Sequence, residues 1–242
     1  MKRLLLFGAI AISINAFAQN VNIPDPFFKS YLLSNVNINT NGDTEIQSSE
    51  ANSFTGTIYC DKAFISDLTG IEAFTSIHTL YCAINQLTSL DVTQNTFLTT
   101  LLCYNNQLTS LDVSQNVFLT HLQCEDNQLE CLNVKNQTNT AFSILYANGN
   151  PNLTCVEVDD VSYSMNNWNN ALFEFDVQTS FSTDCNNACS MSFTGIGELN
   201  TTSKQLLKIV DLMGIETTFK SNTPLIYVYD DGTTEKVFTI ED

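Results

Sequence analysis

Residues 77–97 read IHTLYCAINQLTSLDVTQNTF, and the two segments that follow repeat the pattern: residues 98–118 read LTTLLCYNNQLTSLDVSQNVF, and residues 119–139 read LTHLQCEDNQLECLNVKNQTN. Each copy has leucine at the fourth position, cysteine at the sixth, asparagine at the ninth and leucine at the eleventh and fourteenth. Matches at so many positions over consecutive copies indicate a true repeat. One copy cannot bury its own apolar face, so the copies must stack.

This period and the pattern L-x-x-L-x-C-x-x-N-x-L predict a leucine-rich repeat solenoid, mostly of β structure. The flanking copies are less regular, as terminal repeats usually are. Upstream the same positions hold Ile58, Cys60, Ile65 and Leu68, and downstream they hold Phe142, Leu145, Asn150 and Leu153. We therefore expect about five rungs, within residues 54–160.

The first 18 residues resemble a secretory signal peptide. Lys2 and Arg3 form a basic start, residues 4–14 are apolar, and residues 16–18 read A-F-A, a typical cleavage site. The apolar run is too short to cross a bilayer, and no later segment reaches about 18 apolar residues. We expect a soluble, exported mature chain with no transmembrane segment.

The chain is strongly acidic. Loss of Lys2 and Arg3 would take its formal charge from −17 to −19. Such a charge repels phosphate backbones and so disfavours nucleic-acid binding. It favours divalent cations or a basic partner, although it also fits a secreted protein that is simply kept soluble by its charge.

Residues 19–53 precede the repeats and predict an N-terminal cap with a short helix over residues 24–33. The segment after this helix fits the spacing of an EF-hand calcium loop. The candidate oxygen ligands are Asn39, Asn41, Asp43, the Glu45 carbonyl, Gln47 and Glu50. Asparagine at the first position and Thr44 in place of the turn glycine depart from the pattern, so weak calcium binding and simple capping both stay open.

The cap and the repeats, over residues of about 25–160, resemble internalin-type bacterial leucine-rich repeat proteins, especially the 21-residue subclass with cysteine in the inner strand. The motif L-x-x-L-x-C-x-x-N-x-L-T-S-L-D-V and the segment Ile65–Glu72 carry the likeness. The resemblance implies a binding protein of the cell surface. Caps of that family look like EF-hands without necessarily holding metal.

Residues 161–190 are expected to close the array, with Trp168, Phe173, Phe175, Val177 and Phe181 covering the last rung. Residues 191–242 predict short strands in a small β-sandwich, with a hairpin turn at Asp231 and Gly232. This tail resembles the C-terminal sorting domain of type IX secretion cargo, through Lys208–Gly214, Pro224–Gly232 and Lys236–Ile240. The likeness implies that the type IX machinery is a partner and that export runs through the periplasm.

The cysteines fall into two groups. Cys60, Cys82, Cys103 and Cys124 recur at the repeat period between core leucines, and we expect a buried column of free thiols. Stacked side chains point the same way, which disfavours disulfides or a tetrahedral zinc site along the column. Cys131, Cys155, Cys185 and Cys189 allow three pairings. We prefer Cys155–Cys185, with Cys131–Cys155 as the alternative.

Two polar columns are also expected. Asn85, Asn106, Asn127 and Asn150 should satisfy backbone groups where the chain leaves each inner strand, and Asp91 and Asp112 should form a solvated row. His78 and His121 occupy different positions and neither belongs to a catalytic motif, so we expect no enzyme. A carboxylate pair of a hydrolase is indicated by no spacing.

The remaining candidate is the concave face of the solenoid. The position between core leucine and cysteine points outward, because side chains alternate along a strand. It holds Tyr59, Tyr81, Leu102, Gln123 and Tyr146, and beside it lie Tyr104, His121, Glu125 and Asp126. A row of tyrosines suits recognition of an extracellular protein or glycan, although strands also favour tyrosine in general. A structural envelope or matrix protein is the alternative function, and the sequence does not name the ligand.

Overall fold

A computed structural model describes residues 19–185 and 189 together with four strands of the C-terminal tail. The signal peptide predicted at residues 1–18 lies outside the described residues. The chain divides into two compact units between Met191 and Ser192.

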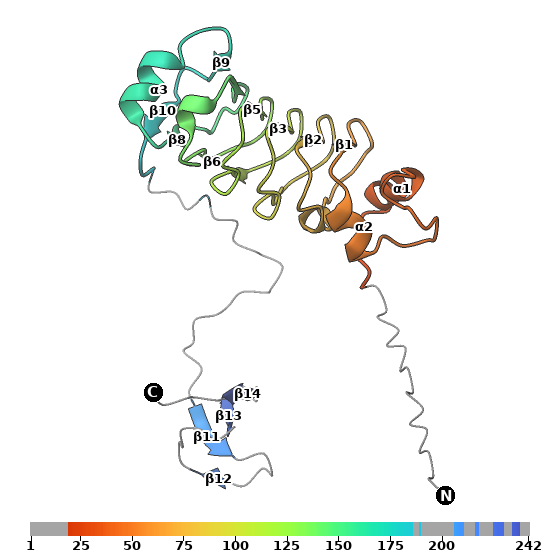
Figure 1. Cartoon of the computed structure of the whole chain (residues 1–242). Coiled ribbons are helices and arrows are strands. Elements are labelled where there is room, and N and C mark those ends of the chain that lie inside the picture. Colours follow the sequence, from red (N-terminus) through yellow and green to blue (C-terminus); the bar gives the residue numbers. More distant parts are fainter. Residues whose placement is uncertain are drawn as a thin grey trace, which may run out of the picture. The chain divides into compact units, whose positions relative to one another are not determined.

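The first unit is a coil of repeats whose inner strands lie side by side in one parallel sheet (Figure 1). Each repeat contributes one short strand, and the next repeat pairs with it in register, so that Leu80, Leu101 and Leu122 stand in a row. The strands, in their order across the sheet, are β1 (Thr57–Tyr59), β2 (Thr79–Tyr81), β3 (Thr100–Leu102), β5 (His121–Gln123), β7 (Ile144–Tyr146) and β9 (Phe173–Glu174). Five of these strands are the predicted rungs, and β9 adds a sixth from the closing segment.

The core consists of the repeated apolar positions. The middle residue of each inner strand is buried and its two neighbours are half-buried or exposed, as expected when side chains alternate across a strand. The leucine two residues after the asparagine of each repeat also fills the interior of the coil. Leu87, Leu108 and Leu129 are fully buried at this position. The predicted leucine-rich repeat solenoid is therefore confirmed by its own ladder geometry.

A second parallel sheet, which the sequence analysis did not anticipate, forms where the repeats read L-D-V. Its strands, in order across the sheet, are β10 (Ser180–Ser182), β8 (Cys155–Glu157), β6 (Cys131–Asn133) and β4 (Ser110–Asp112). Just beyond these strands, the Asp112 carboxylate accepts a hydrogen bond from the Ser114 amide at 2.8 Å, and Asp91 does the same for Thr93. The predicted aspartate row thus closes turns of the coil.

Two columns of asparagine hold the turns together. In the first, the Asn106 amide donates to the carbonyls of Cys82 and Cys103 at 3.1 and 3.0 Å, while its oxygen accepts from Leu87 of the preceding repeat. Asn127 and Asn150 repeat this arrangement. The structural role predicted for this column is confirmed, and Asn95 and Asn116 form a second, fully buried column that donates to carbonyls of two repeats.

The N-terminal end is covered by helices α1 (Pro26–Ser34) and α2 (Ser48–Ser53), followed by the 3-10 turn η1 (Ile71–Ala73). Asp25 begins α1, because one carboxylate oxygen accepts from the amides of Phe27 and Phe28. The other oxygen accepts from the amide and hydroxyl of Ser66, both at 2.9 Å. One buried carboxylate therefore joins the cap to the first rung.

The C-terminal end is covered by α3 (Val161–Asn167), with η2 (Asn139–Ala141) leading into the last full rung. Trp168 is buried there and packs against its aromatic neighbours Phe142, Phe173, Phe175 and Phe181. The expected role of Val177 in this cover is wrong, because its side chain is fully exposed. Trp168 nevertheless organises the closure, as the sequence suggested.

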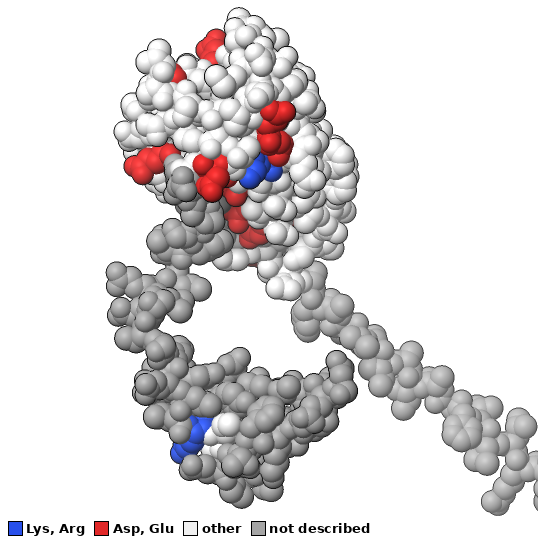
Figure 2. Space-filling view, turned by 90° about the vertical axis from the view of Figure 1, so that its left-hand side faces the viewer, with Lys and Arg blue, Asp and Glu red and all other residues white. Residues whose placement is uncertain are grey.

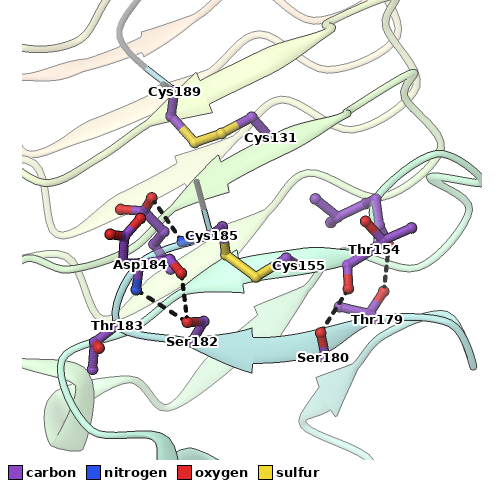
Figure 3. The surroundings of a disulfide bond; sticks show 12 residues. Cys131, Thr154, Cys155, Thr179, Ser180, Ser182, Thr183, Asp184, Cys185 and Cys189 are labelled. Atoms are coloured by element: carbon purple, nitrogen blue, oxygen red, sulfur yellow. Dashed lines mark hydrogen bonds between the residues drawn. A yellow bond between two sulfur atoms is a disulfide. The ribbon is translucent and has the colours of Figure 1, made fainter. Parts of the chain in front are cut away.

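Two disulfides join this closing segment to the repeats (Figure 3). Cys155 pairs with Cys185, the pairing preferred from the sequence, with Cα atoms 5.8 Å apart. Cys131 pairs with Cys189 rather than with Cys155, so the alternative pairing is wrong. Cys131 and Cys155 begin neighbouring strands of the second sheet. Each of them pairs with a different cysteine of the closing segment, and they do not pair with each other.

The described part of the second unit is a four-stranded sheet with antiparallel pairing. The strands, in order across the sheet, are β12 (Glu216–Thr217), β11 (Leu206–Val210), β13 (Leu225–Tyr229) and β14 (Thr234–Val237). A sandwich needs a second sheet, and that part of the prediction stays a prediction. Gly214, Asp231 and Gly232 lie outside the described residues.

Candidate concave binding face

The predicted binding residues form one continuous row across the inner sheet. Strand register places Tyr59 beside Tyr81, Tyr81 beside Leu102, Leu102 beside Gln123 and Gln123 beside Tyr146. Tyr59 is 60% exposed, and the other four are half-buried. The sheet brings together side chains that lie about 22 residues apart in the sequence, and leaves one side of each open to solvent.

Two tyrosines at the N-terminal end of this row stack on each other. The rings of Tyr59 and Tyr81 lie 4.4 Å apart between centroids, with an angle of 21° between their planes. The Tyr31 hydroxyl of α1 accepts from the Tyr59 amide at 2.6 Å, so the cap helps to position the pair. Burial and the neighbouring Tyr59 raise the pKa of the Tyr81 phenol, which therefore stays a neutral hydrogen-bonding group at physiological pH.

The loop edge after the inner strands adds a second line of side chains. The residue that directly follows each cysteine position lies on this loop edge. On two neighbouring rungs that residue is Tyr104 and Glu125. The next residue has a left-handed backbone in every rung: φ is 54° at Lys62 and Ile84, 52° at Asn105, 53° at Asp126 and 70° at Gly149. The sequence analysis missed Ile84, although a β-branched residue in a position otherwise filled by residues such as Asn, Asp and Gly was a signal.

The C-terminal end of the face is acidic. Burial, together with the charges of Asp126 and Glu174, raises the pKa of the Glu125 carboxyl. Its Oε2 atom is buried without a hydrogen-bond partner among the described residues, and so is Oδ1 of Asn148 at the corresponding position of the next rung. Asp126 is exposed. Sequence reasoning had found Glu125 and Asp126 but not Asn148 or Glu174.

His121 begins β5, beside Thr100 on one side and Ile144 on the other. Its Nδ1 atom lies 2.8 Å from the hydroxyl of Thr120, the residue before it. The structure thus places His121 at the opposite end of the strand from Glu125, so the two do not form one cluster.

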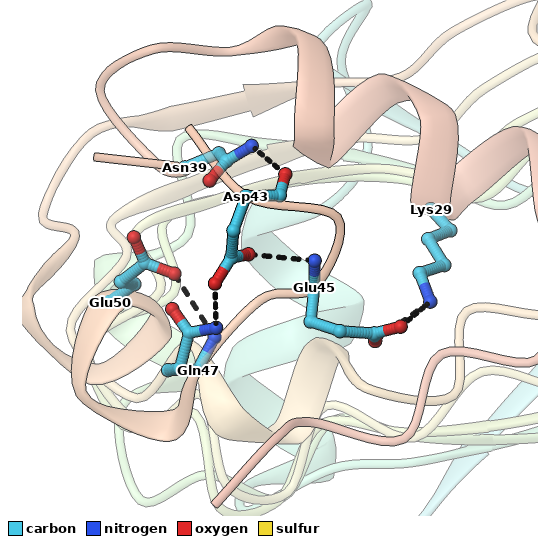
Figure 4. A network of polar contacts seen from close by, with 6 residues as sticks. All are labelled: Lys29, Asn39, Asp43, Glu45, Gln47 and Glu50. Carbon is cyan, nitrogen blue, oxygen red and sulfur yellow. Dashed lines mark hydrogen bonds and ion pairs between the residues drawn. The ribbon is translucent and has the colours of Figure 1, made fainter. Parts of the chain in front are cut away.

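The candidate calcium loop is held by its own side chains (Figure 4). Asn41 donates to Asp43 at 3.0 Å and to Gln47 at 2.7 Å, and Gln47 donates to Asp43 at 2.9 Å. The Glu45 carboxylate points away from the loop and forms an ion pair with Lys29 at 2.8 Å. The oxygens of three proposed ligands are therefore close together, but they are engaged with neighbouring amides.

Two other proposed ligands have structural tasks in this loop. The Glu50 carboxylate accepts from the amides of Thr40, Asn41 and Gln47, and the Asn39 oxygen accepts from the Gly42 amide. Burial alone would raise the pKa of Glu50, but these hydrogen bonds outweigh it and hold the pKa below its usual value. Among the described residues, no three His, Cys, Asp or Glu side chains are placed to share a metal ion. Calcium binding stays a prediction.

The ladder cysteines Cys60, Cys82, Cys103 and Cys124 are free and buried, as predicted. Burial, with a smaller contribution from Asp61, raises the pKa of the Cys60 thiol to about 12. Burial also raises the pKa of the other three. Because the thiolate is the reactive form, these thiols are suited to packing and not to chemistry.

No family model matches the chain, and no curated protein matches it. Two similar solved structures are internalins from Listeria monocytogenes: a functional domain of InlJ that includes a cysteine ladder, and InlF. Identity to InlJ is 23%, over 68% of this chain and 45% of that chain, with a TM-score of 0.42. Identity to InlF is 17%, over 70% of this chain and 55% of that chain, with a TM-score of 0.45.

The chain thus spans about half the length of the internalins that it matches. Its class rests on its own structure, in which parallel strands, leucine rows and asparagine columns define a leucine-rich repeat protein. Within the described residues, no helix is both long and apolar enough to cross a bilayer.

Proposed function

We propose that this protein is a secreted or surface-displayed binding protein, without catalytic activity, that recognises an extracellular protein or glycan through the concave face. The observation that carries the proposal is the stacked Tyr59–Tyr81 pair at one end of an open row of half-buried side chains. Rigid aromatic rings with a hydroxyl supply contact area at small entropic cost, which is why tyrosine is enriched in interfaces.

The size of the face limits what it can hold. Six strands at a spacing of about 4.8 Å give a face roughly 24 Å long. A standard interface buries about 800 Å² on each partner and would use nearly all of it. A short oligosaccharide or one element of a protein fits this area better than a broad globular surface.

A double substitution of Tyr81 and Tyr104 to serine tests the proposal. Both side chains lie on the concave side and outside the core, so we expect an unchanged melting temperature. Binding to a ligand found by a glycan array or a surface pull-down should weaken by about 2 kcal/mol or more if the two are hot spots.

Phe97 and Phe118 provide a matched control. They are 50% and 54% exposed, stack with centroids 6.0 Å apart, and lie outside the inner strands. Serine at both positions removes a similar aromatic pair and should leave binding unchanged. The proposal is wrong if the tyrosine variant binds normally or if both variants lose binding equally.

The Phe97–Phe118 pair also favours the alternative of a structural envelope or matrix component, because an exposed aromatic pair can contact another copy of the chain. Concentration-dependent association that Phe97→Ser and Phe118→Ser abolish would support that role. A monomer at high concentration would exclude it.

For export, we infer a route through the periplasm that uses the type IX machinery, with residues 191–242 as the sorting domain. The antiparallel sheet of β11 to β14 and the sequence likeness support this proposal. Deletion of residues after 191 should leave the repeats folded, as judged by circular dichroism, and retain them in the periplasm. Efficient release of the truncated chain would contradict the proposal, and Gly214 and the Asp231–Gly232 turn are the first point substitutions to examine.

A further inference from the structure

Resting on the concave-face function proposed above, we propose that the partner is a basic polypeptide segment. Its apolar side chains lie on Tyr59, Tyr81 and Ile84, and a lysine or arginine two rungs further on reaches Glu125 and Asp126.

The apolar end contains a residue that fits its backbone poorly. Ile84 has φ of 54° and is 40% exposed. A left-handed backbone is strained for a β-branched side chain and well accepted by Asn, Asp and Gly, which fill this position in the three following rungs. The isoleucine is therefore only partly buried, while its backbone conformation costs stability. Strain of this kind is typically retained where a side chain contacts a ligand.

Ile84 is also well placed to extend the tyrosine pair. It lies two residues beyond Cys82, which directly follows Tyr81 on the same rung, and its amide donates to the Tyr104 carbonyl at 2.9 Å. The first three rungs thus carry the stacked Tyr59–Tyr81 pair, the 40% exposed Ile84 and the half-buried Tyr104.

The acidic end lacks donors. Glu125 Oε2 and Asn148 Oδ1 occupy the same position on neighbouring rungs, and both are buried with no hydrogen-bond partner among the described residues. Buried acceptors without a partner are costly. A bound ammonium or guanidinium group would donate to the exposed Asp126 carboxylate and would offset the charges of Asp126 and Glu174, which act on Glu125.

The described repeat unit has few cations of its own to fill this role. Residues 19–185 contain three lysines and no arginine. Lys29 is paired with Glu45, Lys135 donates to the Thr183 carbonyl, and Lys62 lies three rungs from Glu125. Figure 2 shows acidic side chains in several places over the end of the repeat unit that carries α3 and β10, with little basic surface beside them. The field of this unit therefore attracts a positively charged partner.

The spacing of the two ends fits an extended chain. Tyr81 lies on the second inner strand and Glu125 lies two residues beyond the fourth, and these two strands are two intervals, or about 10 Å, apart. An extended polypeptide advances about 3.3 Å per residue, so the basic residue should follow the apolar one by about three positions. A neutral oligosaccharide matches the tyrosines but offers no cation for Glu125, which is why a polypeptide is favoured.

The test uses fluorescein-labelled 12-residue peptides and the full mature protein. One peptide carries leucine and arginine pairs at the three-residue spacing, a second has glutamate for arginine, and a third has the same composition with the spacing scrambled. A chitosan tetramer is the sugar control. We expect the first peptide to bind best by fluorescence anisotropy, with affinity that falls as salt is raised.

Three variants then separate the contributions of the acidic end and of Ile84 to peptide binding. Glu125→Gln with Asp126→Asn should weaken the arginine peptide about tenfold and flatten its salt dependence. Ile84→Asn should weaken it severalfold while the melting temperature stays equal or rises, because asparagine relieves the backbone. Asp91→Asn with Asp112→Asn removes the same number of charges from the aspartate row, which lies outside the inner sheet, so it should leave binding unchanged and serves as the control for total charge.

The outcomes distinguish the two proposals. The inference is overturned if no peptide binds, if the glutamate peptide or the chitosan tetramer binds as tightly as the arginine peptide, or if the Glu125 and Asp126 variants leave affinity unchanged. A glycan or protein whose binding needs Tyr81 and Tyr104 but ignores charge would sink this inference and leave the concave-face function intact. Binding that is unchanged in both the Tyr81 and Tyr104 variant and the Glu125 and Asp126 variant would rule out both proposals.

Discussion

Replacement of Leu101 by alanine in the central rung should destabilise the repeats by about 3–5 kcal/mol. The side chain is fully buried, and alanine removes three carbons, each contributing about 0.8 kcal/mol of transfer free energy. The void adds about 24 cal/mol for each Å³ that does not collapse. Collapse is hindered because backbone hydrogen bonds join this rung to both neighbours, from Cys82 to Leu102 and from Cys103 to Gln123.

Urea unfolding of the oxidised mature protein measures this loss. Circular dichroism follows the strands, and the fluorescence of Trp168, the one tryptophan of the chain, follows the C-terminal closure. Leu102→Ala is the matched control, since the next residue on the same strand is half-buried and should cost less than about 1 kcal/mol. A loss below about 0.5 kcal/mol for Leu101→Ala, or equal losses for both, would refute the view that the leucine row carries the fold.

Three further predictions follow from the caps and the ladder. Thiol titration of unreduced protein should find no reactive cysteine in the native state and four after denaturation, because the ladder thiols are buried and the other four cysteines are bonded; fewer than four would mean that the ladder oxidises. Calcium at millimolar concentration, if it binds the Asn39–Glu50 loop, should raise the melting temperature, and Glu50→Gln should abolish the rise; no shift in the unaltered protein would leave only the capping role. Burial acts to raise the pKa of Asp25, but hydrogen bonds from Phe28 and Ser66 outweigh it and lower the pKa below the ordinary 3.8. The stability that Asp25 contributes should therefore be complete above about pH 4 and be lost as the pH falls through the lowered pKa; Asp25→Asn should cost about 2 kcal/mol or more at pH 7 and reduce the acid dependence of unfolding, and an unchanged acid profile would contradict this account.

The repeat, its inner strands and its structural asparagines could be predicted because each is written several times in the sequence. Periodicity alone assigns Leu101 to the core and Asn106 to the turns. The second sheet was missed because its L-D-V motif is also compatible with a loop, although its strands are as long as those of the inner sheet. The Cys131–Cys189 bond was missed because the closing segment has no periodicity, so only its fold shows which rung each cysteine faces.

The concave row was predictable from strand alternation, whereas the features that distinguish its two ends were not. Left-handed backbone at Ile84 is a property of the coil, and the sequence signals it only through the Asn, Asp and Gly that fill the same position in the following rungs. The orphaned oxygens of Glu125 and Asn148 depend on stacking between neighbouring rungs. A sequence shows which residues recur, but it does not show which hydrogen bonds remain unmade.

The disulfides at the closing segment determine how this molecule responds to mechanical load. Residues 192–242 leave the repeat unit just after Cys189, which is bonded to Cys131 two repeats back along the coil. Tension applied through the C-terminal unit therefore enters the array at Cys131 through a covalent bond, and Cys155–Cys185 holds the intervening rung in the same way. The terminal strands β9 and β10 are thereby spared from being peeled off one hydrogen bond at a time. The opposite end, where Asp25 and other noncovalent contacts hold the cap, has no such protection among the described residues and is the end from which a pulled array should begin to unravel.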